Sequence, residues 1–74
     1  EVDFIIPETD TAYQVSYSIQ EEATFQREVD GLIKLNNVYP LKQMYIITRD
    51  EERTITHESG ATIEVIPVWK WLLT

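Results

Sequence analysis

The chain has 74 residues, of which 43% are hydrophobic, and it contains no cysteine. That length allows one domain, residues 1–74, and a domain of this size buries only about 60% of its unfolded surface. The net charge of −7 argues against binding nucleic acid through a basic face or docking on an anionic membrane, since both depend on lysine and arginine. No apolar run approaches the roughly 20 residues that span a bilayer. The lack of cysteine fits a cytoplasmic protein.

The first expected element is a β-hairpin. Residues 2–6 are mostly β-branched or aromatic and end at Pro7, which predicts a strand. Residues 12–17 alternate small or polar residues with large apolar ones, which is the period of a second strand. A register that pairs Phe4 with Tyr13 puts aromatic and aliphatic side chains on one face, so we expect that face to pack in the core.

A long helix is expected at residues 21–36. Ser18 and Glu21 have the spacing of a capping box, which would start the helix, and Asn36–Asn37 ends the apolar pattern. The apolar residues that follow helical spacing are Phe25, Val29, Leu32 and Ile33.

The second half of the chain predicts two further strand units. Residues 43–48 contain a continuous apolar run that is typical of a central strand. We expect this strand to lie parallel to residues 12–17, with the helix as the connection between the two. Residues 54–57 and 62–66 flank a Ser-Gly turn and predict a second hairpin. Residues 68–73 are expected to form a short helix that packs its apolar side on the sheet. The expected fold class is α/β with a mixed sheet of about five strands, in the order β-hairpin, helix, strand, β-hairpin, short helix.

Few residues of the chain point to catalysis or to a bound cofactor. His57 is the single histidine, and a lone histidine in a strand beside a turn is usually structural. The acidic run at residues 50–52 has ligands for a hard cation but is typical of a solvated turn. The two glycines are too far apart to form a phosphate-binding loop. We therefore expect no cofactor or metal site in this chain.

One polar constellation corresponds to a specific chemistry. Asp3 in the first strand and Gln14 and Ser16 in the second share one face of the predicted hairpin. In such an arrangement two carboxylates hold Mg²⁺ while a neighbouring lysine assists an attacking water. Gln14 offers a neutral carbonyl where a carboxylate is needed, and Ser16 offers no cation. The set is therefore incomplete for metal-dependent hydrolysis.

Several segments resemble a known family in their order and spacing. They are Glu1–Ile6, Tyr13–Ser18, Arg27–Glu28, Tyr45–Thr48 and Val65–Leu73, the last ending in Trp-Lys-Trp-Leu-Leu. Together they look like the C-terminal domain of unknown function that is attached to many prokaryotic AAA+-type ATPases and has a PD-(D/E)XK nuclease-like fold. The resemblance covers nearly the whole chain.

The resemblance implies a role for each residue of the constellation. Asp3 matches the aspartate of the nuclease fold, whereas Gln14 and Ser16 stand where an active nuclease has a carboxylate and a lysine. It thus implies a truncated restriction-endonuclease-like core that is catalytically degenerate. Because strand-like sequence begins at once after Glu1, we expect a fragment of a longer protein. The missing helix and strand of the fold and the ATPase domain would lie upstream, and ATP and Mg²⁺ would belong to that parent.

Three functions are compatible with these patterns. The favoured one is a degenerate nuclease-like module for protein interaction or regulation, with the upstream ATPase domain as its partner and without nucleic acid or membrane binding. Because one helix cannot cover all the aromatic residues of such a sheet, we expect the remaining apolar surface to contact either a second copy in a homo-oligomer or the missing segments of the parent. The alternatives are a metal-dependent nuclease and a purely structural domain.

Overall fold

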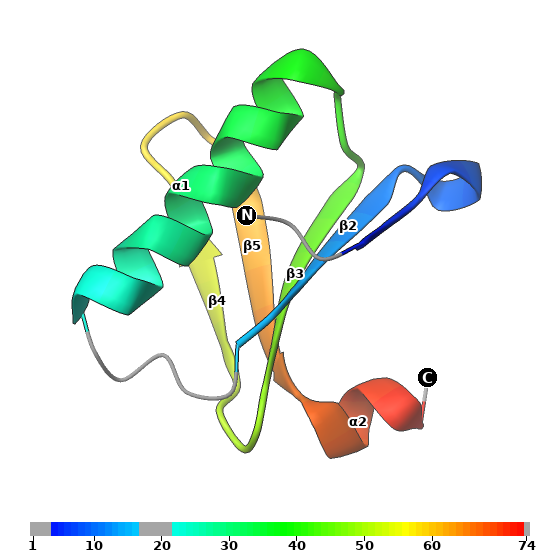
Figure 1. Cartoon of the computed structure of the whole chain (residues 1–74), viewed down its shortest axis with the longest axis vertical. Helices are drawn as coiled ribbons and strands as arrows, with labels where there is room; N and C mark the ends of the chain where they lie inside the picture. Colours follow the sequence, from blue (N-terminus) through cyan, green and yellow to red (C-terminus); the bar gives the residue numbers. More distant parts are fainter. Residues whose placement is uncertain (1–3, 17–21, 74) are drawn as a thin grey trace.

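The computed structural model describes residues 4–16 and 22–73 of the chain. In chain order the elements are β1 (Phe4–Ile6), the 3₁₀ helix η1 (Pro7–Thr9), β2 (Thr11–Val15), α1 (Glu22–Val38), β3 (Gln43–Thr48), β4 (Arg53–Thr56), β5 (Thr62–Pro67) and α2 (Val68–Leu72) (Figure 1). The α/β class and the expected order of elements are confirmed. None of the helices in these described ranges is long and apolar enough to cross a membrane.

The five strands form one mixed sheet in the order β1-β2-β3-β5-β4. Strands β2, β3 and β5 run parallel, and β1 and β4 pair antiparallel at the two edges. The parallel pairing of β2 with β3 confirms the predicted strand–helix–strand unit, and β3 is central as expected. The pairing of β5 with β3, which brings the second hairpin against the first unit, was not predicted.

The face of the hairpin that enters the core differs from the expectation. Phe4 does pair with Tyr13, as the side-chain pattern predicts. Helix α1, however, packs on the opposite face, to which β2 contributes Ala12. Ala12 lies beside Met44 in the register of β2 and β3, so its face continues into the aliphatic residues of the central strands. The small Ala12 lets a helix approach closely, whereas the aromatic face holds large rings.

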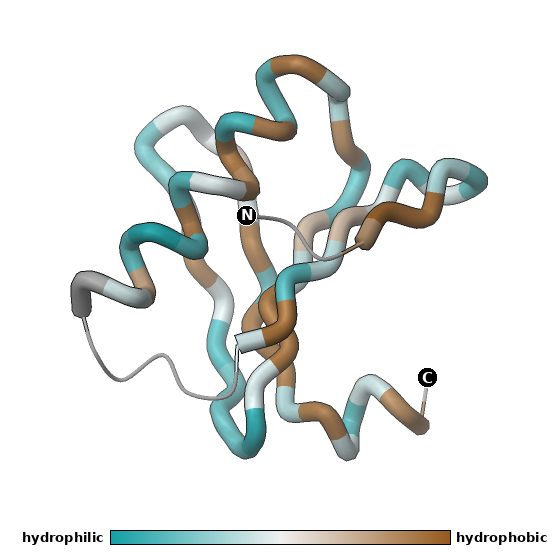
Figure 2. Tube along the Cα trace, in the orientation of Figure 1, coloured by the Kyte–Doolittle hydropathy of each residue, from teal (hydrophilic) through white to brown (hydrophobic). Residues whose placement is uncertain are grey.

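The hydrophobic core fills the space between α1 and this face of the sheet. Its buried members are Ala12, Val29, Leu32, Ile33, Met44, Ile46, Ile63 and Val65. The predicted helical stripe is therefore confirmed, with Phe25 partly buried against the cluster. Figure 2 shows hydrophobic residues recurring along α1 and concentrated in the central strands. Ile46 and Val65 are register partners with no exposed surface, so β3 and β5 form the centre of the core.

Helix α1 ends at Val38, later than the sequence pattern predicts. The expected capping residues, Ser18–Glu21, lie outside the described residues. Asn36 lies inside the helix, and its side-chain oxygen accepts a 2.8 Å hydrogen bond from the Leu41 N–H in the turn that follows. Pro40 then prevents continuation, since it has no N–H to donate.

A left-handed residue closes the turn between β1 and β2. Asp10 has a φ of 50°, a conformation that aspartate tolerates better than most side chains. Its carboxylate accepts a 3.2 Å hydrogen bond from the Tyr39 hydroxyl, and its carbonyl accepts a 2.8 Å bond from the Lys42 N–H. These bonds join the amino-terminal hairpin to the loop between α1 and β3.

The short helix α2 lies on the sheet face that α1 leaves uncovered. The helix was expected to pack its apolar side on the sheet, but only Trp71 does so. Trp71 is half-buried against the sheet, whereas Trp69, Leu72 and Leu73 are 57%, 71% and 80% exposed. Because the helix has five residues, it cannot turn all of these side chains toward the sheet.

Candidate functional site

Two of the three predicted nuclease positions, Gln14 in β2 and Ser16 directly after the strand ends at Val15, are buried. Gln14 is 6% exposed and Ser16 is 8% exposed. Gln14 lies beside Ile46 of the core, and alternation along the strand puts Ser16 on the same side. Asp3 lies outside the described residues. The two side chains are thus packed on the face that α1 covers and not presented at an open cleft.

The side-chain oxygen of Gln14 has an unusual environment. It is buried and has no hydrogen-bond partner among the described residues. An unpaired buried acceptor costs about 1–3 kcal/mol, and an unpaired carboxylate would cost more. A neutral amide is therefore easier to accommodate here than the carboxylate of an active nuclease. Within residues 4–16 and 22–73, no three His, Asp or Glu side chains gather where they could hold a metal ion.

The opposite face of the sheet carries an aromatic ladder across three strands. Tyr13 is the register partner of Phe4 on one side and of Tyr45 on the other. The Phe4 and Tyr13 ring centroids are 4.8 Å apart, and those of Tyr13 and Tyr45 are 5.2 Å apart, both in stacked geometry. Cross-strand aromatic pairs of this kind stabilise a sheet. The rings thus form a preorganised row on a surface that α1 does not cover.

Helix α2 adds a fourth ring to the row. Trp71 is tilted against Tyr13 and Phe4, with centroid distances of 5.8 and 6.3 Å. We call Phe4, Tyr13, Tyr45 and Trp71 the aromatic cluster. Phe4 keeps 36% of its surface exposed, and Tyr13, Tyr45 and Trp71 are half-buried. The cluster is therefore partly accessible to solvent.

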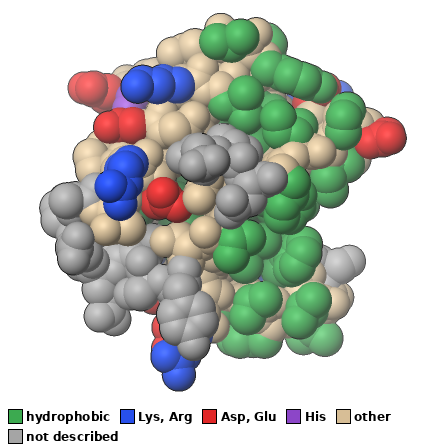
Figure 3. Space-filling model, viewed as in Figure 1, with side chains coloured by type: hydrophobic (Ala, Val, Ile, Leu, Met, Phe, Trp, Pro, Cys, Tyr) green, Lys and Arg blue, Asp and Glu red, His purple; other side chains and the backbone are tan. Residues whose placement is uncertain are grey.

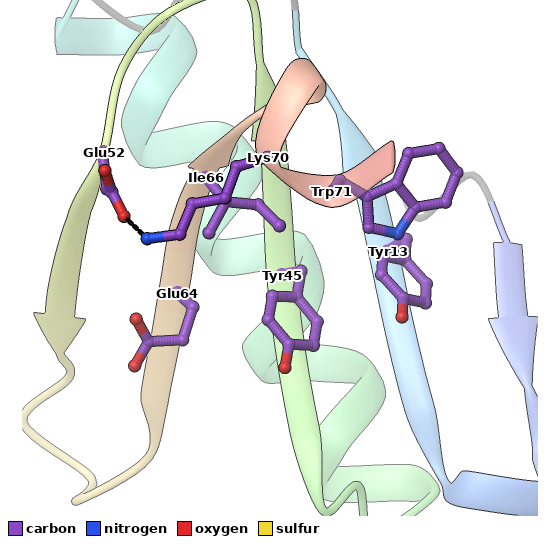
Figure 4. A pocket seen from close by; sticks show the side chains of 7 residues that line it. All are labelled: Tyr13, Tyr45, Glu52, Glu64, Ile66, Lys70 and Trp71. Atoms are coloured by element: carbon purple, nitrogen blue, oxygen red, sulfur yellow. Dashed lines mark hydrogen bonds and ion pairs between the residues drawn. The ribbon is translucent and has the colours of Figure 1, made fainter. Parts of the chain in front are cut away.

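A hollow of about 320 Å³ adjoins the aromatic cluster. Its lining residues come from four strands or loops and from α2: Tyr13, Tyr45, Glu52, Glu64, Ile66, Lys70 and Trp71. Figure 4 views the sheet from the side opposite α1 and shows Tyr45 between Tyr13 and Glu64. The hollow is thus aromatic on one side and bears carboxylates on the other.

The polar groups of the hollow are held in different ways. Lys70 of α2 forms an ion pair with Glu52, which follows β3 in the chain. Glu64 of β5 accepts a 2.9 Å hydrogen bond from the Thr54 hydroxyl. The Tyr45 hydroxyl donates a 2.7 Å hydrogen bond to the side-chain oxygen of Gln43. These bonds hold the polar side chains at the rim of the hollow.

Tyr45 stays neutral at physiological pH. Partial burial raises its pKa, and the negative charge that Tyr13 and Glu64 would place beside a phenolate raises it further. The phenol therefore offers a ring face and a hydroxyl, not a charge, to a molecule in the hollow. Glu64 lies beside Tyr45 as its register partner in β5.

The other residues that the sequence singled out lie away from this hollow. His57 sits at the turn between β4 and β5, where its Nδ1 accepts a 3.1 Å hydrogen bond from the Ser59 N–H. That bond gives His57 a structural role in the turn. Of the acidic run, Glu52 does reach the hollow, through its ion pair with Lys70.

Sequence reasoning did not find the hollow. The pairing of Phe4 with Tyr13 was visible as a pattern, but Tyr45 and Glu64 join the row only because β3 and β5 pair in parallel. The signal available in the sequence was that Tyr45 and Glu64 alternate with apolar residues along their two strands. A predicted parallel register of β3 and β5 would have placed Tyr45 beside Glu64.

Comparisons of this chain with protein-family models, with curated proteins and with solved structures gave no match. The resemblance to the ATPase-linked, nuclease-like domain therefore stays a prediction. The function has to be argued from the geometry of the described residues.

Proposed function

We propose that this chain is a catalytically degenerate, nuclease-like module that binds another protein through the aromatic cluster. The partner is the ATPase domain of a prokaryotic AAA+-type parent protein, and the module acts on that domain in the cytoplasm. ATP and Mg²⁺ belong to the ATPase domain in this proposal, and the module supplies contact surface alone.

The observation that carries the proposal is the aromatic cluster on the uncovered face of the sheet. Aromatic residues are enriched in protein interfaces and depleted on other surfaces. The cluster continues into α2, where Trp69 and Leu72 are more than half exposed. Figure 3 shows hydrophobic side chains gathered over the side of the molecule where β1 and α2 lie. A contiguous exposed apolar surface of this kind is typical of an interaction site.

The buried nuclease positions favour binding over catalysis. Gln14 and Ser16 are buried on the side of the sheet that α1 covers, and neither supplies the charge that would hold a metal and position its water. A working metal-dependent nuclease needs those groups at an open surface. The environment of β2 thus supports a degenerate module.

Charge favours protein over nucleic acid as the partner. Stacked rings are also a platform for bases, but base-stacking proteins combine them with a positively charged groove. Here Glu52 and Glu64 line the hollow beside the rings, and the chain has a net charge of −7. Phosphate would be repelled by this surface.

Site-specific photocrosslinking in cells tests the proposal. Leu72, which is 71% exposed beside the cluster, is replaced by photoreactive benzoylphenylalanine in the full-length parent. The matched control is Val38, an exposed apolar residue at the far end of α1. We expect crosslinks to peptides of the ATPase domain from position 72 and few from position 38.

The same experiment has outcomes that contradict the proposal. Equal crosslinking from both positions would mean that the cluster is not a specific interface. Adducts with nucleic acid in place of protein would overturn the choice of partner. Adducts between two copies of the module would replace the ATPase domain with a homo-oligomer as the binding partner.

A nuclease assay tests the degenerate character separately. We expect no cleavage of DNA or RNA by the 74-residue chain with Mg²⁺ or Mn²⁺. Metal-dependent cleavage that disappears in the Asp3→Ala variant would establish the alternative, an active nuclease. Cleavage that Asp3→Ala leaves unchanged would identify a contaminant.

A further inference from the structure

The aromatic ladder ends at an open ring face. Tyr13 covers one side of the Tyr45 ring, with 5.2 Å between centroids and 12° between planes. On the other side, the register partner of Tyr45 in β5 is Glu64, which has no ring. Figure 4 shows the hollow on this side of Tyr45. A flat group that enters the hollow would continue the stack by one more layer.

The charged residue on that side of Tyr45 is Glu64, its register partner in β5. Glu64 is half-buried, and its one described partner is the neutral hydroxyl of Thr54. Among the described residues no cation pairs with it, because the nearby Lys70 pairs with Glu52. A ligand that filled the hollow without a positive charge would strip water from Glu64 and leave its negative charge without a counter-charge, which is costly.

We propose that the hollow receives an arginine side chain of the protein partner, with its guanidinium stacked on Tyr45 and paired with Glu64. This inference rests on the proposed protein-binding function and names the chemistry of its central contact. The guanidinium is planar, weakly hydrated and able to bond a carboxylate through two N–H groups. It can therefore stack on the Tyr45 ring and pair with Glu64 at the same time. A lysine ammonium satisfies the carboxylate but lacks the flat surface for stacking.

The chain itself contains an example of this kind of contact. On the other face of the sheet, the guanidinium carbon of Arg53 lies 4.4 Å from the centre of the Phe25 ring. The geometry is that of a cation–π interaction. The hollow of about 320 Å³ has room for one such side chain. The overall charge of −7 also attracts a basic segment at long range.

Titration with matched peptides tests the inference. The probes are acetyl-Gly-Arg-Gly-amide and the same peptide with citrulline, which keeps the flat shape but has no charge. Binding to the 74-residue chain is followed by NMR shifts of the Tyr45 ring. We expect the arginine peptide to bind about tenfold or more tightly than the citrulline peptide, as for a hydrogen bond to a charged group. The Glu64→Gln variant should lose that preference, whereas Glu58→Gln, an exposed control, should keep it.

The outcomes separate this inference from the proposed function. Equal binding of the two peptides, or an arginine preference that survives Glu64→Gln, would overturn the arginine contact. If crosslinking from position 72 still reaches the ATPase domain in that case, the protein-binding function stands with a different contact. If the crosslinks are absent as well, both proposals fail. Acetyl-Gly-Lys-Gly-amide is titrated in the same way, and stronger binding of this lysine peptide than of the arginine peptide would also overturn the stacking argument.

Discussion

The rings of Tyr13 and Tyr45 stack with 5.2 Å between their centroids because β2 and β3 pair in parallel and put the two residues directly side by side. The same pair lines the hollow in which we place the partner's arginine. Stability and binding therefore share these side chains.

Replacement of Tyr13 by alanine should destabilise the domain. The ring contacts Phe4, Tyr45 and Trp71, so its removal interrupts the row in the middle. Because Tyr13 is half-buried, we expect a loss of about 2 kcal/mol in the free energy of unfolding, below the range for fully buried rings. Urea denaturation measures the loss. The Tyr13→Phe variant, which keeps the ring, should lose less than half as much, and an equal loss in both variants would contradict the stacking argument.

Replacement of Gln14 by methionine should stabilise the domain. Methionine has a similar length and removes the buried oxygen that has no described partner. We expect a gain of about 1 kcal/mol in the free energy of unfolding, since that oxygen no longer loses its hydration on folding. Gln14→Glu is the matched comparison and should destabilise at neutral pH, because it brings a charge to the same place. A destabilised Gln14→Met variant would show that the amide is satisfied in solution.

The ionisation of Tyr45 should respond to Glu64. The raised pKa of Tyr45 has partial burial as its main cause, followed by Tyr13 and Glu64. NMR titration of the Tyr45 ring should therefore give a midpoint above the ordinary tyrosine value of about 10. Glu64→Gln should lower that midpoint, and Glu58→Gln should not change it. A midpoint unchanged by Glu64→Gln would place the carboxylate away from the ring.

The same pKa directions predict how stability depends on alkaline pH. Burial and the facing charges raise the pKa of Tyr45, and the hydrogen bond to Asp10 is the main cause that raises the pKa of Tyr39. Groups with a raised pKa in the folded state contribute stability below the unfolded pKa and lose it as pH rises through the folded one. The free energy of unfolding should therefore fall above about pH 10. The double variant Tyr39→Phe/Tyr45→Phe should show a smaller fall.

The ion pair between Lys70 and Glu52 should contribute little to stability. Both side chains are about half exposed, at 47% and 49%. Exposed pairs contribute less than about 1 kcal/mol and weaken with salt. A double-mutant cycle with Lys70→Met and Glu52→Gln should give a coupling energy in that range. A coupling energy well above about 1 kcal/mol would mean that the ion pair stabilises the position of α2 on the sheet.

Most of the local structure could be predicted from the sequence. The alternation in residues 12–17, the apolar spacing from Phe25 to Ile33 and the apolar run at residues 43–48 identified the strands and the helix because backbone geometry imposes those periods on any half-buried element. The pairing of Phe4 with Tyr13 followed from side-chain pattern alone, since a one-residue slip would mix the two faces. The end of α1 at Val38 lies beyond the predicted residue 36, because the apolar pattern does not show that the Asn36 side chain bonds the Leu41 N–H after the helix.

The tertiary structure decided which face became the core and where the candidate site lies. In isolation, the aromatic side of the hairpin looks more suitable for burial than the side with Ala12. The aliphatic residues of β3 and β5 are in register with Ala12, however, and the larger apolar surface that they form together attracts α1. The rings of Tyr13 and Tyr45 were left on the uncovered face for that reason. Burial is a property of the assembled sheet, so no single strand of the sequence could reveal it.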